Sequence, residues 1–338
     1  MVSVSNTASW RAQAGKWSSV TGFTLGVSSV TTLEAMPAED FYARELDAIP
    51  THAHRETVGE IGTAWWNYGP TNGPIDLVLV HGFRGDHHGL EPFVAKLGPK
   101  IRIVIPDLPG FGSTDPLAPT SVDEPRIRPY ALWLRSFLDT IGADDKTTVL
   151  GHSFGSIVVS AAFHEGLAQS RCILVNPIAA NALQGPRGLM TRLAVLYYQV
   201  SAALPERAGQ ALLRNRAIVR IMSVTMAKTK DRALRRWIHG QHDSYFSSFA
   251  SRASVLEAFK ASVEADVSEY ASSLPPHTML IVAERDDITA LPKQHELASR
   301  LTEARLEVVP GVGHLVHYEA PDFAATAISD FLTARGRK

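Results

Sequence analysis

A serine stands between two glycines in the run Gly151-His-Ser153-Phe-Gly155. This pattern is weak evidence alone, so its neighbours decide its meaning. The strand-like run 147–150 leads into it, and a run typical of a helix, 156–163, follows directly. Strand, sharp turn and helix form the setting in which such a serine is exposed as a nucleophile. The two glycines omit side chains that would collide in the turn, and the helix N-terminus favours a developing negative charge.

A serine hydroxyl needs a general base, and the chain holds 13 histidines. His314 is the strongest candidate, because it follows the strand-like run 306–309 in the sequence Pro310-Gly-Val-Gly-His314. It therefore belongs to the same sheet edge as Ser153, the edge at which open α/β sheets place their sites. His317, three residues later, is the main rival.

The base needs a carboxylate to orient it. The strand-like run 278–282 is followed by three acids, Glu284, Asp286 and Asp287, of which Asp286 is the first choice and Asp287 the second. The stretch after the preceding strand, 176–181, contains no carboxylate. The later position is therefore favoured for the acid.

Acyl transfer also requires donors for an oxyanion. The backbone N–H of Phe154, next to the serine, is one candidate. The backbone N–H of Phe83, in the run His81-Gly-Phe-Arg-Gly85, is the second, since the flanking glycines permit a tight turn. We expect His81 to brace this loop by hydrogen bonds and to take no part in proton transfer.

The elements that must position these residues alternate between strand and helix patterns. Strand-like runs occur at 63–68, 76–81, 101–107, 147–151, 172–175, 278–282 and 306–309. Helical patterns occur at 124–142, 154–168, 292–303 and 321–335. The strand-like runs are almost continuously apolar, which is typical of a mostly parallel sheet covered on both faces. Strand–helix alternation of this kind predicts a doubly wound α/β fold.

One interval interrupts the alternation. About 100 residues separate the strand-like run 172–175 from the run 278–282, and the segment 180–270 is rich in Arg, Leu and Ala in helical patterns. We interpret 180–270 as an inserted helical cap and 51–179 with 271–338 as the α/β core. Residues 1–50 are predicted to be a partly irregular arm without the features of a signal peptide.

Composition excludes several classes. The chain has 338 residues, 33 Lys+Arg and 34 Asp+Glu, so its net charge of −1 gives no indication of a nucleic-acid partner. Its one cysteine, Cys172, lies in an apolar run and is expected to be buried, with no intramolecular disulfide. No run is long and apolar enough to span a membrane. A cytoplasmic location is therefore the default expectation, and the sequence does not indicate an oligomeric state.

The chain resembles the α/β-hydrolase superfamily, specifically the capped group that includes small esterases, haloperoxidases and C–C bond hydrolases. The resemblance covers about residues 55–335 without the inserted helices, and it rests on five pieces in the expected order: 81–85, 107–113, 151–155, 283–286 and 313–314. It implies a mostly parallel eight-stranded sheet flanked by helices. It also implies a catalytic triad of Ser153, Asp286 and His314, with Phe83 and Phe154 as oxyanion donors.

The remaining matched piece, 107–113, resembles the family's structural turn and is assigned no chemistry. Two features depart from the family pattern. The N-terminal arm is longer than usual, and two histidines, His87 and His88, follow the oxyanion loop. They could line the site entrance, but we prefer to interpret them as solvated loop residues, because loops are generally exposed.

Hydrolysis of a carboxylic ester with an apolar acyl or alcohol part, without metal or organic cofactor, is the leading hypothesis. Cleavage of a C–C bond in a diketone-like ring-fission product is the second, although His152 and Phe154 depart from the Gly-Asn-Ser-Met-Gly run of that group. A third hypothesis, from another class, is a ligand-binding member of the fold without chemistry. The complete triad argues against it.

Overall fold

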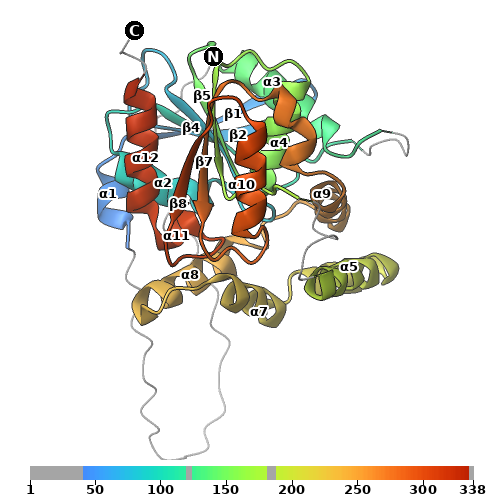
Figure 1. Cartoon of the computed structure of the whole chain (residues 1–338). Coiled ribbons are helices and arrows are strands. Elements are labelled where there is room, and N and C mark those ends of the chain that lie inside the picture. The colour runs from blue at the N-terminus through green and yellow to red at the C-terminus, as the bar shows by residue number, and fades with distance from the viewer. Residues whose placement is uncertain (1–40, 119–123, 181–187, 335–338) are drawn as a thin grey trace, which may run out of the picture. The chain divides into compact units, whose positions relative to one another are not determined.

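A computed structural model of the chain describes residues 41–118, 124–180 and 188–334. Within these ranges, helices and strands alternate as the sequence predicts (Figure 1). None of the described helices is long and apolar enough to cross a membrane. Most of the predicted N-terminal arm, residues 1–40, lies outside the described residues.

Eight strands form one sheet in the order β1-β2-β4-β3-β5-β6-β7-β8. The pairs β1–β2 and β2–β4 are antiparallel and every other pair is parallel. The predicted mostly parallel eight-stranded sheet is therefore confirmed. The strands are β1 (Thr51–Val58), β2 (Ile61–Tyr68), β3 (Leu77–Val80), β4 (Ile103–Pro106), β5 (Thr148–His152), β6 (Arg171–Val175), β7 (His277–Ala283) and β8 (Arg305–Val309).

The seven strand-like runs of the sequence correspond to β2 through β8, whereas β1 has no counterpart among the predicted elements. All four residues of β3 and of β4 are buried, which accounts for their continuous apolar sequence. Seven of the eight residues of β1 are exposed, because this strand pairs only with β2 at the sheet edge. Its polar sequence therefore lacks the apolar pattern that identifies a strand.

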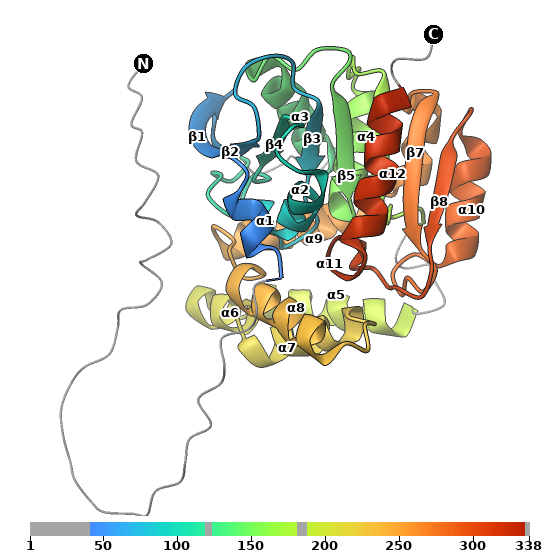
Figure 2. The same cartoon turned by 90° about the vertical axis from the view of Figure 1, so that its left-hand side faces the viewer.

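Helices cover both faces of the sheet (Figures 1 and 2). The buried side chains of α2 and α12 belong to one apolar cluster, and those of α3, α4 and α10 belong to another. The sheet thus separates two cores, as in other doubly wound folds. These helices, with the short α1 and α11, are α1 (Ala43–Asp47), α2 (Glu91–Leu97), α3 (Arg128–Thr140), α4 (Phe154–His164), α10 (Leu291–Arg300), α11 (Val316–Glu319) and α12 (Pro321–Thr333).

Between β6 and β7, where the sequence indicates an insertion, the described residues form five further α-helices and a 3₁₀ helix. Figure 2 shows α5 to α8 as a layer beyond one end of the sheet. Asn215 caps α7, Asp231 caps α8 and Ser251 caps α9, each by accepting backbone N–H bonds. The helices are α5 (Gly188–Ala203), α6 (Glu206–Leu213), α7 (Arg216–Met226), α8 (Arg232–Tyr245), α9 (Arg252–Glu264) and η3 (Val267–Ser273).

Candidate active site

Ser153 occupies the sharp turn between β5 and α4. Its φ of 53° is a left-handed conformation that a non-glycine residue adopts only when its surroundings impose it. A Cβ on Gly151 would lie 2.4 Å from the carbonyl oxygen of Gly155, and a Cβ on Gly155 would lie 2.2 Å from that of Val80. Both positions therefore require glycine, and the turn holds the Ser153 side chain at the start of α4.

A relay of hydrogen bonds links three side chains from three strand ends. His314 Nε2 lies 2.8 Å from Ser153 Oγ, and His314 Nδ1 lies 2.8 Å from Asp286 Oδ2. Because a carboxylate accepts only, Nδ1 carries the proton toward Asp286 and Nε2 is free to accept from the serine hydroxyl. The other carboxylate oxygen of Asp286 accepts from the backbone N–H of Ile288, which fixes the orientation of the carboxyl group.

The rival residues lie in other environments. Asp287 forms an ion pair with Lys228. Glu284 accepts a hydrogen bond from the backbone N–H of Gly311 at 2.7 Å. His317 is buried, and burial holds its pKa well below the usual range. The structure therefore brings together Ser153, Asp286 and His314, the set that the sequence predicts.

The two predicted oxyanion donors lie close to the serine. A Cβ on Gly82 would lie 3.3 Å from Ser153 Cβ, so the loop that carries Phe83 packs directly against the nucleophile position. The rings of Phe83 and Phe154 are in edge contact, with 6.3 Å between their centroids. Neither backbone N–H donates to another residue within the described ranges. Both amides are thus available to an oxygen bound beside Ser153.

His81 braces this loop, as the sequence predicts. Its Nδ1–H donates to the carbonyl of Gly82 at 2.9 Å, and its Nε2 accepts from the backbone N–H of Leu108 at 2.8 Å. Burial lowers the pKa of His81, so the ring is neutral and keeps one donor and one acceptor. The ring thereby ties the end of β3 to the turn after β4.

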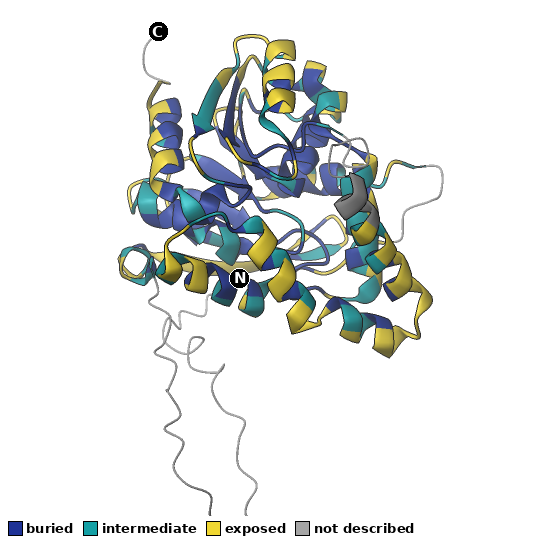
Figure 3. Cartoon of the chain, turned by 60° about the horizontal axis from the view of Figure 1, so that its bottom comes forward, coloured by how far each residue is buried: buried dark blue, intermediate teal, exposed yellow. Residues whose placement is uncertain are grey.

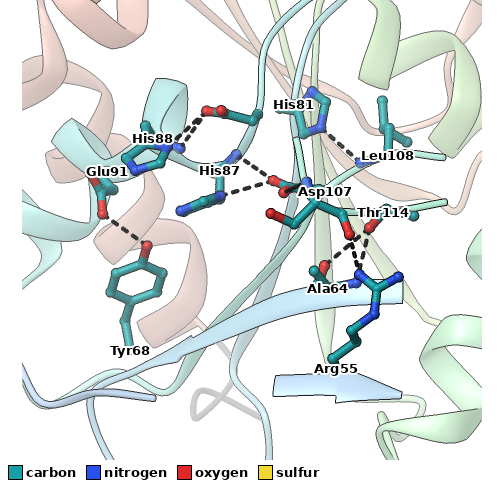
Figure 4. Close-up of polar contacts among 12 residues, drawn as sticks. Arg55, Ala64, Tyr68, His81, His87, His88, Glu91, Asp107, Leu108 and Thr114 are labelled. Atoms are coloured by element: carbon teal, nitrogen blue, oxygen red, sulfur yellow. Dashed lines mark hydrogen bonds and ion pairs between the residues drawn. The ribbon is translucent and has the colours of Figure 1, made fainter. Parts of the chain in front are cut away.

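Asp107 organises that turn from the inside, as Figure 4 shows. It is fully buried and accepts from the backbone N–H and the Nδ1–H of His87, both at 2.9 Å, and from the backbone N–H of Ser113 at 2.8 Å. Burial alone would raise its pKa, but these bonds outweigh burial and the pKa is lowered. Asp107 therefore has a structural role.

The interpretation of His87 and His88 as solvated loop residues is wrong. His87 is buried and stacks on Trp66 with 3.3 Å between ring centroids. His88 is partly buried, bonds Asp86 Oδ1 at 3.0 Å and stacks on Tyr245 of α8. Neither histidine lines the cavity over Ser153. Asp86 directly precedes these histidines, but Asp107, Trp66 and Tyr245 lie in other elements, so the local sequence does not reveal the burial.

Asp86, His87 and His88 are also the described residues whose ligand-type atoms come close enough to share a metal ion, within 4.8 Å of one another. Each imidazole Nδ1 is already bonded to a carboxylate. Hydrogen bonding and ring stacking account for the cluster, and we assign it no metal.

Asn176, in a stretch without a carboxylate, fixes the backbone of the loop that carries His314. Its Nδ2–H donates to the backbone carbonyl of His314 at 2.7 Å, and its Oδ1 accepts from the backbone N–H of Ala283 at 2.8 Å. Its φ of 44° places it in the left-handed region that asparagine tolerates better than most residues. Its place directly after β6, at the same edge as the triad, is the signal that could have identified it.

Arg84, the residue after Phe83, is the second residue that the sequence analysis did not single out. It is 1% exposed and donates to the backbone carbonyls of Phe246 at 3.0 Å and Leu213 at 2.6 Å, and to the hydroxyl of Tyr198 at 3.3 Å. Its guanidinium also lies over the Phe246 ring, 5.1 Å from the centroid. One side chain of the oxyanion loop therefore anchors segments of the inserted helices.

A cavity of about 150 Å³ lies over Ser153. Five buried histidines line it together with the buried carboxylate Asp86 and mostly apolar side chains. Burial lowers the pKa of His81, lowers that of His152 and His242 to about 3, and holds that of His317 well below 6.5, so these four histidines are neutral at physiological pH. The cavity wall therefore offers no fixed positive charge beside the reacting serine.

A sequence model described as "Alpha/beta hydrolase family" matches residues 77–327. Among curated proteins, the chain is 33% identical over 111 residues to the magnesium-chelatase 30 kDa subunit of Rhodobacter capsulatus. That alignment covers 31% of this chain and 36% of the relative, so the match spans about a third of that protein's length.

Solved structures show the same fold at low sequence identity. An esterase from Thermogutta terrifontis superposes with a TM-score of 0.63 and 20% identity, covering 84% of this chain and 98% of that one. An enol-lactonase from Burkholderia xenovorans has a TM-score of 0.66 and 17% identity, covering 83% and 100%. At these identities the likeness establishes the fold, and function depends on the site itself.

Proposed function

Since the chain belongs to the alpha/beta hydrolase family, we propose that it is a serine hydrolase that cleaves a carboxylic ester through an acyl-enzyme on Ser153. The observation that supports this proposal is the continuous relay from Ser153 Oγ through His314 to Asp286, with both hydrogen bonds at 2.8 Å. A nucleophile, its base and an orienting acid at these separations are the groups that acyl transfer requires.

In the first half-reaction, His314 Nε2 takes the proton of Ser153 as Oγ attacks the ester carbonyl. The resulting oxyanion accepts hydrogen bonds from the backbone N–H groups of Phe83 and Phe154. Asp286 stabilises the imidazolium by accepting from Nδ1–H. His314 then gives its proton to the departing alcohol, and the acyl group stays on Ser153.

In the second half-reaction, His314 Nε2 takes a proton from a water molecule, whose oxygen attacks the acyl carbonyl. The same two amides stabilise the second oxyanion. Collapse releases the carboxylic acid and returns the proton to Ser153. Every proton in this cycle is moved by His314, so the proposal requires no metal and no organic cofactor.

The surroundings of the serine favour an uncharged, apolar substrate. Leu90, Met226, Phe246, Ile288 and Leu315 line the cavity, and four of its five histidines are neutral because burial lowers their pKa. Three of these apolar residues come from outside the inserted helices, while Met226 and Phe246 come from α7 and the end of α8. We therefore propose that the inserted helices act as a cap that shapes the binding site.

Turnover of p-nitrophenyl esters of graded acyl length tests this proposal. We expect hydrolysis by the native chain and none above background by Ser153→Ala. Intact-mass measurement during turnover should detect the acyl group, and peptide mapping should locate it on Ser153. Absence of turnover with every ester, together with cleavage of a diketone or with ligand binding alone, would transfer support to the C–C hydrolase or to the binding-protein hypothesis.

A further inference from the structure

Positive charge is concentrated in the inserted helices α5 to α8. Residues 188–245 contain ten Lys+Arg and only three Asp+Glu, although the whole chain has 33 and 34. The rest of the chain therefore has a clear excess of acids. Two of the three acids are engaged locally, because Asp231 caps α8 by accepting from backbone N–H groups and Asp243 pairs with Arg220. The net charge of −1 conceals a strongly cationic segment.

The same helices expose large apolar side chains. Leu193, Leu196 and Val200 recur at helical spacing on α5, and Leu204 follows that helix directly, so these four residues form one stripe. On α7, Ile221 and Val224 are 65% and 57% exposed. These six account for most of the large apolar side chains that are exposed within the described ranges, and Figure 3 shows exposed residues along these helices.

Several of the basic side chains have no carboxylate partner. Arg216, Arg232 and Arg236 are exposed and form no ion pair with any described residue. Arg220 pairs with Asp243, and Arg235 bonds the carbonyl of Thr229. We call the six exposed apolar residues, with Arg216, Arg232 and Arg236, the cationic apolar face.

We propose that the cationic apolar face docks on the surface of an anionic lipid bilayer. Amphipathic helices with basic polar positions lie in the interface, where apolar side chains enter the headgroup region and Lys or Arg pair with anionic lipids. The face offers both components in one layer of helices, in which α5 packs on α6 and α7 packs on α8. The combination of basic and exposed apolar side chains therefore favours an anionic bilayer as the binding partner.

Other occupants fit this surface less well. A second copy of the chain would oppose one cationic surface to another. Residues 1–40 of this chain contain two basic residues and three acids, so their net charge of −1 gives little attraction to the face. A nucleic acid or an acidic protein would match the charge but would leave six large apolar side chains unexplained.

Docking would place the proposed active site at the lipid. Met226 ends α7 and lines the cavity over Ser153, two residues after the exposed Val224. Ile288, which lines the same cavity, is 47% exposed. This part of the inference rests on the proposed function. An ester hydrolase whose active site lies at the lipid surface would act on an ester that partitions into the bilayer. Docking itself is measurable without turnover, so its failure and that of the hydrolase proposal are distinguishable.

Vesicle sedimentation with the full chain tests the electrostatic half of the proposal. We expect binding to phosphatidylcholine vesicles containing phosphatidylglycerol, little binding to pure phosphatidylcholine, and release at high salt. The double variant Arg232→Glu/Arg236→Glu should bind at least about tenfold more weakly, since each basic residue near an anionic surface contributes measurably. The matched control is Lys100→Glu/Lys146→Glu, which makes the same charge change before β4 and β5, at the opposite edge of the sheet.

Site-directed fluorescence tests insertion of the apolar stripe. The chain's one cysteine, Cys172, is fully buried, so a thiol-reactive fluorophore will label an introduced surface cysteine selectively. A nitrobenzoxadiazole label on Leu196→Cys should shift to shorter wavelength with anionic vesicles. The same label on Thr302→Cys, between α10 and β8, should not shift.

Several results would overturn the proposal. Equal binding to both vesicle types, or equal binding by the two double variants, would remove the electrostatic basis. Absence of a fluorescence shift at Leu196→Cys would exclude insertion. Binding of an acidic polymer or formation of a dimer that Leu196→Glu disrupts, without vesicle binding, would assign the face to another partner.

Discussion

Asp286 Oδ2 lies 2.8 Å from His314 Nδ1, whereas the next carboxylate along the chain, Asp287, pairs with Lys228. Because the two adjacent carboxylates have different partners, we expect matched variants at these positions to have different effects on kcat. Asp286→Asn should lower kcat by about 10³- to 10⁴-fold, because an amide cannot hold the required tautomer of His314. Asp287→Asn, the control with the same change of charge, should retain kcat within about threefold. Ester kinetics that reverse this order would move the acid by one residue.

Arg84 predicts coupling between the oxyanion loop and the inserted helices. Arg84→Met should destabilise the chain by about 2–4 kcal/mol, since the carbonyls of Leu213 and Phe246 lose buried donors. It should also slow phosphonylation of Ser153 by about tenfold or more, because Phe83 is the neighbouring residue and its N–H depends on the loop.

Urea unfolding and inhibitor kinetics measure the two effects of Arg84→Met separately. Arg126→Met, which removes an arginine paired to Glu257 and Glu264 away from the cavity, is the control. A variant of Arg84 that loses stability but reacts with the inhibitor at the native rate would show that the residue has a structural role alone.

Asn176 predicts a positioning effect on the base. Asn176→Asp keeps the size of the side chain and the acceptor for Ala283 N–H, but it directs a carboxylate oxygen at the carbonyl of His314. We expect kcat to fall by about tenfold or more while KM changes little, because the substrate does not contact this residue. The acid limb of the pH–rate profile should move as the position of His314 changes. An unchanged profile with reduced stability would contradict a positioning role.

The buried histidines predict that acid destabilises the folded chain. Burial lowers the pKa of His152 and His242 from 6.5 to about 3 and lowers that of His317 well below 6.5. A lowered folded-state pKa means that the unfolded chain binds more protons, so stability is complete above 6.5 and is lost as the pH falls toward 3. Each such histidine contributes up to about 1.4 kcal/mol per pH unit within that window.

Urea unfolding at about pH 7 and about pH 5 measures this dependence. The free energy of unfolding should be lower at the acidic pH. In His242→Asn, which keeps a donor toward Ser223, the difference between the two values should be smaller by the contribution of one histidine. A stability that is constant or increases on acidification would contradict the predicted burial effect.

The sequence predicts this fold and site where the determinants are local. The sharp turn at Ser153 depends on glycines two residues to either side, and the strands β3 to β7 are apolar because both sheet faces are covered. The strand β1 was not predicted, because it is an exposed edge strand and its sequence lacks an apolar pattern.

Contacts between distant segments account for the other differences. The prediction for His87 and His88 was wrong because their burial depends on Asp107, Trp66 and Tyr245, which are far along the chain. The partners of Arg84 are likewise more than 100 residues away. Such contacts leave no local sequence pattern, so the roles of the residues that depend on them can be identified only in the folded structure.

Active-site labelling tests the central claim most directly. A fluorophosphonate should modify the native chain at one residue, and peptide mass spectrometry should place the phosphonyl group on Ser153. His314→Gln should slow the modification by about 10³-fold or more, because Ser153 then lacks its base, while His317→Gln should react at nearly the native rate. Labelling that persists in Ser153→Ala, or a requirement for His317 in place of His314, would contradict the assignment of the nucleophile and its base.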